Sequence, residues 1–257
     1  MTLALAAFLG LLIGLTLGAL GGGGSILTVP ALVYAVGEPA RAATTASLVI
    51  VGVSAAVAVV AQARAGHVRW RPGLALGAAG VAASFGGTAA NRAVPVPVLL
   101  SCFAGLMVLA AVAMLAKRRG SEPVPEPPAR VEHTGAAVAV RVLLVGLVVG
   151  FLTGFLGVGG GFIVVPALVL LLRYPMAEAV GTSLLVITLN SGVGLLARTG
   201  SAAFHWSVIV PFTVTAVVGS LAGHAGARRV SGERLTRAFA GLLLSVAAYV
   251  AVRVALG

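Results

Sequence analysis

The stretch Gly18-Ala-Leu-Gly-Gly-Gly-Gly-Ser-Ile-Leu-Thr-Val-Pro-Ala-Leu-Val33 decides the fold, because the chain contains it twice. A second copy, Gly154-Phe-Leu-Gly-Val-Gly-Gly-Gly-Phe-Ile-Val-Val-Pro-Ala-Leu-Val169, follows 136 residues later, and ten of the sixteen positions are identical. The same shift pairs Pro39 with Pro175, Ser47 with Ser183, Ser84 with Ser220, Gly87 with Gly223, Phe103 with Phe239 and Gly105 with Gly241. A single register held over this length indicates an internal duplication, not chance similarity between two apolar helices.

The composition places both copies in a membrane. Of 257 residues, 60% are hydrophobic and 9% are charged, with a mean hydropathy of +1.12, whereas a soluble domain carries about a quarter charged residues. Disordered chains are low in hydrophobicity, so a soluble two-domain enzyme and a disordered chain are both excluded. The net charge of +11 does not indicate nucleic-acid binding, because the 17 Lys and Arg residues form short clusters between apolar runs. We expect an all-α polytopic protein whose environment is the lipid bilayer.

Ten apolar segments are predicted to be helices. They are 2–20, 25–36, 43–63, 73–90, 97–116, 137–157, 161–172, 179–197, 207–226 and 236–256. Segments 25–36 and 161–172 are short for a membrane crossing, and each follows a glycine cluster, so we expect them to be broken or re-entrant. The stretch from Met1 to Leu20 has neither a positive amino-terminal region nor a clear cleavage site, which favours a retained membrane helix over a signal peptide.

The chain is predicted to contain two repeats and a linker. Residues 1–116 form the first transmembrane repeat, 117–136 a charged, Pro-rich linker, and 137–257 the second repeat. The loops richest in Lys and Arg are expected on the cytoplasmic side of the cell membrane, which makes the linker cytoplasmic and the repeats opposite in direction. Each inverted repeat then has a glycine-broken helix pair plus three spanning helices, which is the recurring plan of secondary transporters.

The two glycine clusters are the predicted site. Non-helical backbone survives inside the hydrocarbon only where it lines a cavity or is buried in protein. Each cluster precedes a short helix whose N-terminus offers free N–H groups and a partial positive charge, and glycine lets an anion approach the backbone closely. Two such ends would form an anion site near the bilayer midplane. The alternative role, close helix packing, is favoured for other glycines such as Gly77, Gly80, Gly146 and Gly150.

Polar side chains near the start of the third helix of each repeat extend this site. The hydroxyls of Thr45, Ser47, Thr182 and Ser183 could cap helix N–H groups or bind an anionic ligand. Asn190 lies deeper in an apolar run, where an amide needs a site contact or an interhelical bond. The predicted substrate-binding residues are Gly21, Gly22, Gly23, Gly24, Ser25, Thr45, Ser47, Gly157, Gly159, Gly160, Gly161, Thr182, Ser183 and Asn190.

No catalytic apparatus is predicted. Glu38 and Glu178 are expected in loops at the membrane surface, so no buried acidic proton carrier is evident. A small insertion aligns His67 with His205, and each lies close to a Trp, which favours interfacial anchoring, with a proton relay as the alternative. No acidic pair, Ser/His/Asp set or zinc-ligand spacing occurs, so no catalytic residue, metal or cofactor is expected. The single Cys102 is expected to be a small core hydrophobe.

The two glycine-rich copies, together with Ala179-Val-Gly-Thr-Ser-Leu184, resemble the TauE/SafE sulfite exporter family. The resemblance covers nearly the whole chain. It implies a membrane transporter, often an exporter, of sulfur-containing anions such as sulfite, thiosulfate or sulfonates, coupled to the proton gradient. The first repeat departs from the pattern, since it reads Thr45-Ala46-Ser47 where the second reads Gly181-Thr182-Ser183. Two alternatives stay open: a cation or metal permease of similar architecture, and a non-transporting membrane scaffold. The residues do not determine the oligomeric state.

Overall fold

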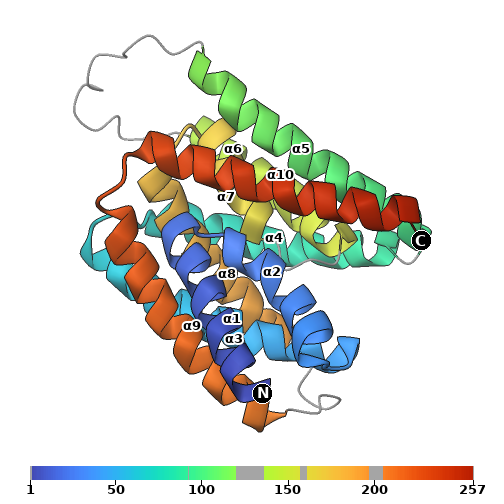
Figure 1. Ribbon diagram of the computed structural model, residues 1–257. Coiled ribbons are helices and arrows are strands. Elements are labelled where there is room, and N and C mark those ends of the chain that lie inside the picture. The colour runs from blue at the N-terminus through green and yellow to red at the C-terminus, as the bar shows by residue number, and fades with distance from the viewer. Residues whose placement is uncertain (1, 92, 120–135, 157–160, 197–204, 257) are drawn as a thin grey trace.

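The computed structural model describes residues 2–91, 93–119, 136–156, 161–196 and 205–256, and within these ranges every regular element is a helix (Figure 1). The elements are α1 (Thr2–Leu20), α2 (Gly23–Pro30), the π-helix η1 (Ala31–Val36), α3 (Ala40–Arg64), α4 (Trp70–Asn91), α5 (Val96–Arg119), α6 (Ala136–Leu156), α7 (Gly161–Leu170), α8 (Met176–Leu196), α9 (Trp206–Ala227) and α10 (Gly232–Leu256). The predicted all-α class is confirmed.

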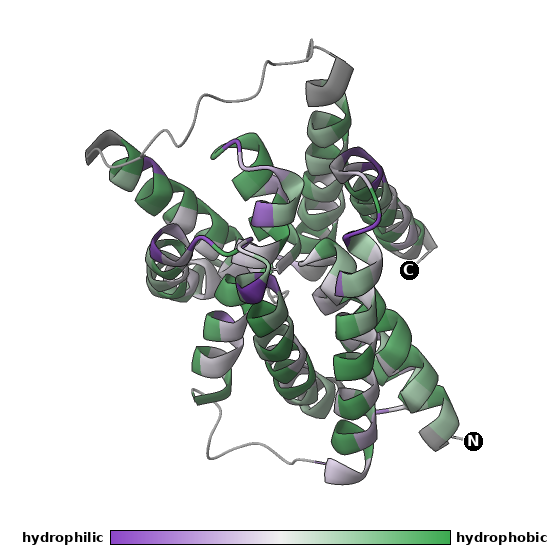
Figure 2. Cartoon of the chain, turned by 90° about the vertical axis from the view of Figure 1, so that its left-hand side faces the viewer, coloured by the Kyte–Doolittle hydropathy of each residue, from purple (hydrophilic) through white to green (hydrophobic). Residues whose placement is uncertain are grey.

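Seven of the described helices are long and apolar enough to cross a membrane: α3, α4, α5, α6, α8, α9 and α10. At a rise of ~1.5 Å per residue, their lengths match the ~30 Å hydrocarbon core. Large apolar side chains such as Phe8, Phe85 and Leu109 stay exposed on the outside, and Figure 2 shows hydrophobic colour along most of the helices. A surface of this kind suits lipid, so the multi-pass membrane class is confirmed.

The two halves of the chain are interleaved, because helices of one half pack on helices of the other. In Figure 1, α1 lies beside α9, and α5 lies beside α10. A Cβ added at Gly14 of α1 would collide with the backbone carbonyl of Ala216 in α9, and one added at Gly18 would collide with that of Ser220. The two helices therefore run parallel in backbone contact, which only glycine allows.

The packing of α6 on α4 repeats this arrangement. A Cβ at Gly150 would collide with the carbonyl of Gly80, and one at Gly154 would collide with that of Ser84. The 136-residue shift that relates Gly18 to Gly154 also relates Ser220 to Ser84, so the same contact occurs twice. The prediction that Gly80, Gly146 and Gly150 serve close helix packing is confirmed.

The short elements α2 and α7 lie in the interior with α3 and α8. Every residue of α7 from Gly161 to Leu168 is buried, and α8 is buried on all sides from Ala179 to Ile187. The helices α3 and α8 are equivalent under the shift and pack antiparallel, since Gly52 faces Ser191 and Gly194 faces Leu48. This central layer holds most of the buried hydroxyl groups.

The outer helices turn one face inward. On α5 that face carries Phe103, Met107 and Ala111, which are buried at one-turn spacing. Cys102 lies off this face and is exposed. The prediction that Cys102 is a core residue was wrong, because in a membrane protein an apolar run also covers the outer surface.

Candidate functional site

The first glycine cluster reverses the chain between α1 and α2. Gly21 follows the last residue of α1 with φ +78°, a left-handed conformation that favours glycine. Its N–H donates to the carbonyl of Leu17 at 2.8 Å, which completes the last turn of α1. Further along, a Cβ at Gly24 would lie 2.5 Å from the carbonyl oxygen of Ile13, so α2 folds back along α1. The break is therefore a tight helical hairpin.

The start of α2 offers backbone donors inside the protein. The first four N–H groups of a helix have no partner within the helix, and the N-cap residue Gly22 has no side chain to cap them. All residues from Gly21 to Ile26 are buried. The Ser25 hydroxyl donates to the Gly22 carbonyl at 2.8 Å, so it does not occupy these N–H groups. The positive end of α2 is thus uncapped by side chains and shielded from solvent.

The first glycine cluster meets Gly161, the described residue of the second cluster, in the interior. A Cβ on Gly22 would collide with the backbone carbonyl of Gly161 and would come within 2.8 Å of the Phe162 nitrogen. A Cβ on Gly161 would lie 2.7 Å from the Ser25 Oγ. The N-terminus of α2 and the beginning of α7 are therefore in backbone contact. The predicted site residues Gly157, Gly159 and Gly160 lie outside the described residues.

Among the predicted hydroxyls, that of Ser183 lies at this junction. A Cβ on Gly21 would be 2.5 Å from the Ser183 Oγ, and Ser183 is fully buried. Its hydroxyl donates to the carbonyl of Val180 at 2.8 Å, as that of Ser47 does to Thr44. The junction thus brings together Gly21, Gly22, Ser25, Gly161 and Ser183.

The other predicted residues face neighbouring helices. Gly23 lies against Leu242 of α10 and Gly24 against α1. The Thr182 hydroxyl accepts the backbone N–H of Arg69 at 3.2 Å, while Thr45 is buried in α3.

The capping role considered for these hydroxyls was wrong. The helices begin at Ala40 and Met176, directly after Pro39 and Pro175, and not at the hydroxyl residues. Proline before or within the first helical turn is a known start signal, and it could have located both helix starts in the sequence.

Two buried polar atoms have no hydrogen-bond partner among the described residues of α3 and α8. They are the Oδ1 of Asn190 and the Oγ of Ser54. Asn190 lies seven residues after Ser183, on the same face of α8. Ser54 was not among the predicted site residues, although the 136-residue shift relates it to Asn190. That relation is the signal by which the sequence could have identified it.

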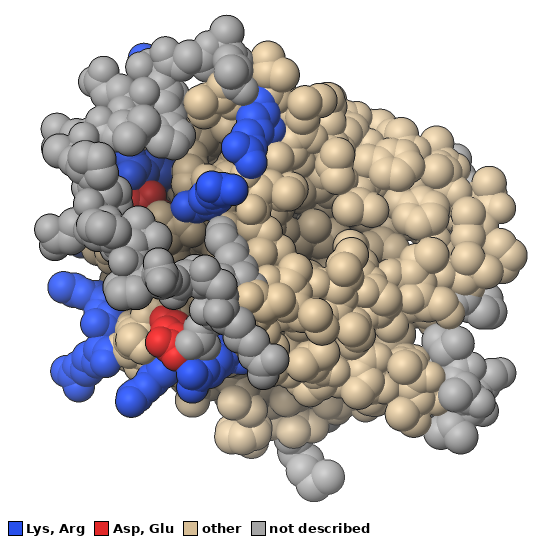
Figure 3. Space-filling model, turned by 90° about the horizontal axis from the view of Figure 1, so that it is seen from above, with Lys and Arg blue, Asp and Glu red and all other residues tan. Residues whose placement is uncertain are grey.

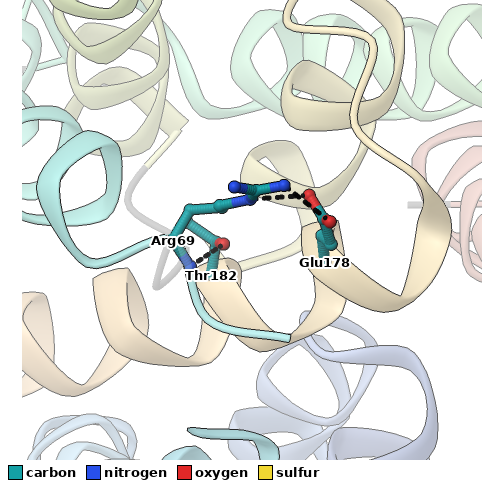
Figure 4. Close-up of polar contacts among 3 residues, drawn as sticks. All are labelled: Arg69, Glu178 and Thr182. Atoms are coloured by element: carbon teal, nitrogen blue, oxygen red, sulfur yellow. Dashed lines mark hydrogen bonds and ion pairs between the residues drawn. The ribbon is translucent and has the colours of Figure 1, made fainter. Parts of the chain in front are cut away.

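An ion pair joins the two halves at one end of α8. The Arg69 guanidinium donates from Nε and Nη2 to the two carboxylate oxygens of Glu178, each at 2.9 Å (Figure 4). These bonds raise the pKa of Arg69 above its ordinary value, against a smaller opposing effect of burial. Burial raises the pKa of the neighbouring Tyr174 phenol, while Arg69 lowers it. Glu178 belongs to the first turn of α8, so its predicted placement in a loop was wrong.

A similar contact at the opposite end of the α3–α8 pair uses a histidine. The Nδ1 of His205, just before α9, lies 2.7 Å from the Oε2 of Glu38, just before α3. In the other half, the aligned His67 contacts the Oε1 of Gln62 at 3.1 Å. The two histidines that align between the repeats thus have specific polar partners.

Basic residues gather at the α8 end of the molecule. The loops that carry Arg69, Tyr174 and Arg228 adjoin there, since Arg69 pairs with Glu178 and Gly232 packs on Met176. Figure 3 shows Lys and Arg side chains concentrated on one side of the face it presents. The concentration agrees with the grouping of the Lys- and Arg-rich loops in the sequence.

Comparisons with known proteins agree with this architecture. The family described as sulfite exporter TauE/SafE matches residues 6–250. A probable membrane transporter protein of Xylella fastidiosa (strain Temecula1) is 35% identical over 245 residues, which cover 93% of this chain and 91% of that protein. The probable membrane transporter protein YdhB of Bacillus subtilis (strain 168) is 26% identical over 246 residues, covering 91% and 96% of the two chains.

No solved structure matches the chain significantly. The assignment therefore rests on the family match over nearly the whole chain and on the transporter relatives, with the helical membrane architecture described above. The chain belongs to the sulfite exporter TauE/SafE family and is a membrane transporter, not an enzyme.

Proposed function

We propose that the protein is a secondary transporter that exports small sulfur-containing anions, such as sulfite, thiosulfate or sulfonates. The observation that carries the proposal is the junction of the two glycine clusters, where Gly22 meets Gly161 beside the uncapped start of α2. Helix N-termini and glycine backbone suit an anion. The name of the family supports the sulfur class of the substrate.

The distribution of acidic residues supports an anion over a cation. The chain contains no Asp, and its six Glu residues are Glu38, Glu122, Glu126, Glu132, Glu178 and Glu233. Three belong to the 117–136 linker, one precedes α3, and two lie in the first turns of α8 and α10. Membrane cation sites generally use buried carboxylates, so the cation or metal permease is the weaker candidate. A scaffold role is weaker still, because buried helix breaks are costly without a cavity to serve.

In the proposed mechanism, the two repeats have opposite orientations and rock about the central junction. The anion lies near Gly21–Ser25 and Gly157–Gly161, held by backbone N–H groups and by neighbouring hydroxyl and amide groups. In each of the two rocked positions of the repeats, the bound anion is exposed to one side of the membrane. The Arg- and Lys-rich end, with the linker, faces the cytoplasm, and the proton gradient drives export. Because helix dipoles supply only partial charges, binding is weak enough to permit release.

The test is sulfite flux in proteoliposomes containing purified protein. Gly22→Val should reduce flux to background, since the new side chain would occupy the position of the Gly161 carbonyl. Gly241→Val is the matched control, because a Cβ at Gly241 meets nothing within 4 Å. Wild-type flux in folded Gly22→Val protein would contradict the proposal. Competition by divalent cations in place of sulfite would favour the cation permease, and a wild-type protein that moves no solute would favour the scaffold.

A further inference from the structure

We propose that Ser54 and Asn190 contact the transported solute from opposite halves of the chain, and that this solute carries a hydrogen-bond donor as well as its negative charge. The inference rests on the proposed function and narrows its substrate class. It is carried by the unpartnered polar atoms of α3 and α8 and not by the glycine clusters; a third such atom, the Nδ1 of His224, lies in α9.

The first argument is the cost of the unpartnered atoms. Ser54 is completely buried, and its Oγ has no partner among the described residues. The Oδ1 of Asn190 is also buried without a partner there. Buried polar atoms are nearly always hydrogen-bonded, because leaving one unsatisfied forfeits its hydration. The neighbouring buried hydroxyls of Ser47 and Ser183 do find partners, in the carbonyls one turn earlier.

The second argument is that Ser54 in the first repeat and Asn190 in the second repeat occupy corresponding positions of the duplicated sequence. The shift that relates the repeats converts Ser47, Val51 and Ser54 into Ser183, Ile187 and Asn190. In each set the residues are four and three apart, so they share one face of their helix. Independent local defects have no reason to match in this way: the unpartnered Nδ1 of His224 corresponds to Thr88, whose hydroxyl donates to the Ser84 carbonyl.

The third argument is what surrounds Ser183, Ile187 and Asn190. The Ser183 Oγ is 2.5 Å from a Cβ built on Gly21, and the Ile187 Cδ1 is 2.7 Å from a Cβ built on Gly161. Asn190 is the next residue along the face that meets the glycine junction. The antiparallel register that places Gly52 beside Ser191 brings Ser54 to the level of Asn190. The two polar groups therefore lie at the same depth of the α3–α8 pair.

The chemistry of the atoms defines the ligand. An amide Oδ1 only accepts hydrogen bonds, while a serine hydroxyl can donate or accept. With the Asn190 amide oriented so that Oδ1 faces the solute, a bare anion, which offers acceptors alone, would satisfy Ser54 and leave Oδ1 unpaired. An anion that also carries an O–H or N–H group satisfies both. Sites built to bind a polar group discriminate strongly against analogues that lack it.

Two sulfonates of matched charge test this chemistry. Isethionate carries a hydroxyl that ethanesulfonate lacks. Wild-type protein should transport isethionate about tenfold faster at limiting concentration, as expected for one hydrogen bond. Asn190→Leu should abolish that preference, and Ser54→Ala should slow both solutes. The control is Ser220→Ala, since the buried Ser220 hydroxyl already donates to the carbonyl of Val217 at 2.8 Å, and it should keep the wild-type preference.

Thermal unfolding of the solute-free protein gives a second readout that does not need transport. If the two atoms await a ligand, Ser54→Ala and Asn190→Leu should unfold at or above the wild-type temperature, because each removes an unsatisfied polar atom. Lower unfolding temperatures in both would assign them a structural role and overturn the inference. Equal transport of the two sulfonates by wild type would do the same, while absence of flux of sulfite and of both sulfonates would instead contradict the proposed function.

Discussion

At one end of the α3–α8 pair, Arg69 binds Glu178 with two hydrogen bonds, and at the other end His205 contacts Glu38. In both cases a residue just before one helix, α4 or α9, reaches a Glu at the start of a helix of the other half, α8 or α3. The two contacts are similar in place, although the 136-residue shift relates Glu38 to Tyr174 and not to Glu178. The chemistry differs, since a guanidinium stays charged throughout the physiological range, whereas an imidazole is charged only when protonated.

The contrast between the two end contacts shows which contacts stay the same in both copies of a duplicated sequence and which change. The glycine contacts of α1 with α9 and of α6 with α4 are the same in both halves, because backbone contact admits no other residue. The end contacts are partly exposed, so side chains can change there without disturbing the packing.

The largest effect should come from breaking the packing that the halves share. Gly150→Val should destabilise the fold by about 3 kcal/mol, because the side chain would collide with the backbone of Gly80 and force α6 from α4. Gly14→Val, its repeat equivalent, should cost a similar amount. Thermal unfolding in detergent measures both. The matched controls Gly105→Ala and Gly241→Ala have open space at Cβ and should not lower the unfolding temperature, so equal losses in all four variants would refute the account.

A smaller effect is expected at the Arg69 end. Glu178→Gln should lower stability by about 1 kcal/mol, since it removes a two-bond ion pair whose Arg69 side chain is 56% exposed and screened by solvent. The loss should be the same at pH 6 and pH 8, because the guanidinium keeps its charge over that range. Chemical unfolding at the two pH values measures it. A loss that changes with pH would show that another group titrates in this contact.

The smallest effect is expected at the His205 end. The Nδ1 of His205 lies 2.7 Å from the Oε2 of Glu38, but the His205 side chain is half exposed and solvent screens the contact. Glu38→Gln should therefore lower stability by about 0.5 kcal/mol or less, which is smaller than the loss expected for Glu178→Gln. Chemical unfolding of the variant and the wild type measures this. A loss larger than that of Glu178→Gln would reverse the order expected for the two ends.

Local sequence signals predicted the helices well. Segment 207–226 is observed as Trp206–Ala227 and segment 73–90 as Trp70–Asn91, since long apolar runs bounded by polar residues form helices in a membrane. The starts of α3 and α8 were predicted about three residues late, because the proline start signal was not used. The error moved Glu178 from a loop into the first turn of α8.

The site was predictable only in part. The glycine clusters stand out by composition, so Gly22 and Gly161 could be named from the sequence. Ser54 could not be recognised alone, because a single Ser in an apolar helix usually bonds to its own backbone. Its lack of a partner is a property of the packed α3, and the sequence does not contain it.

The sequence by itself determined the number and extent of the helices, the duplication and the two breaks, because these follow from hydropathy, glycine content and an internal register. Only the tertiary structure decided that α1 packs on α9 across the two halves, that Gly22 meets Gly161, and that Arg69 pairs with Glu178. The physical reason is that apolar faces of similar composition are interchangeable as partners. Shape complementarity at small residues then selects which helices come into contact.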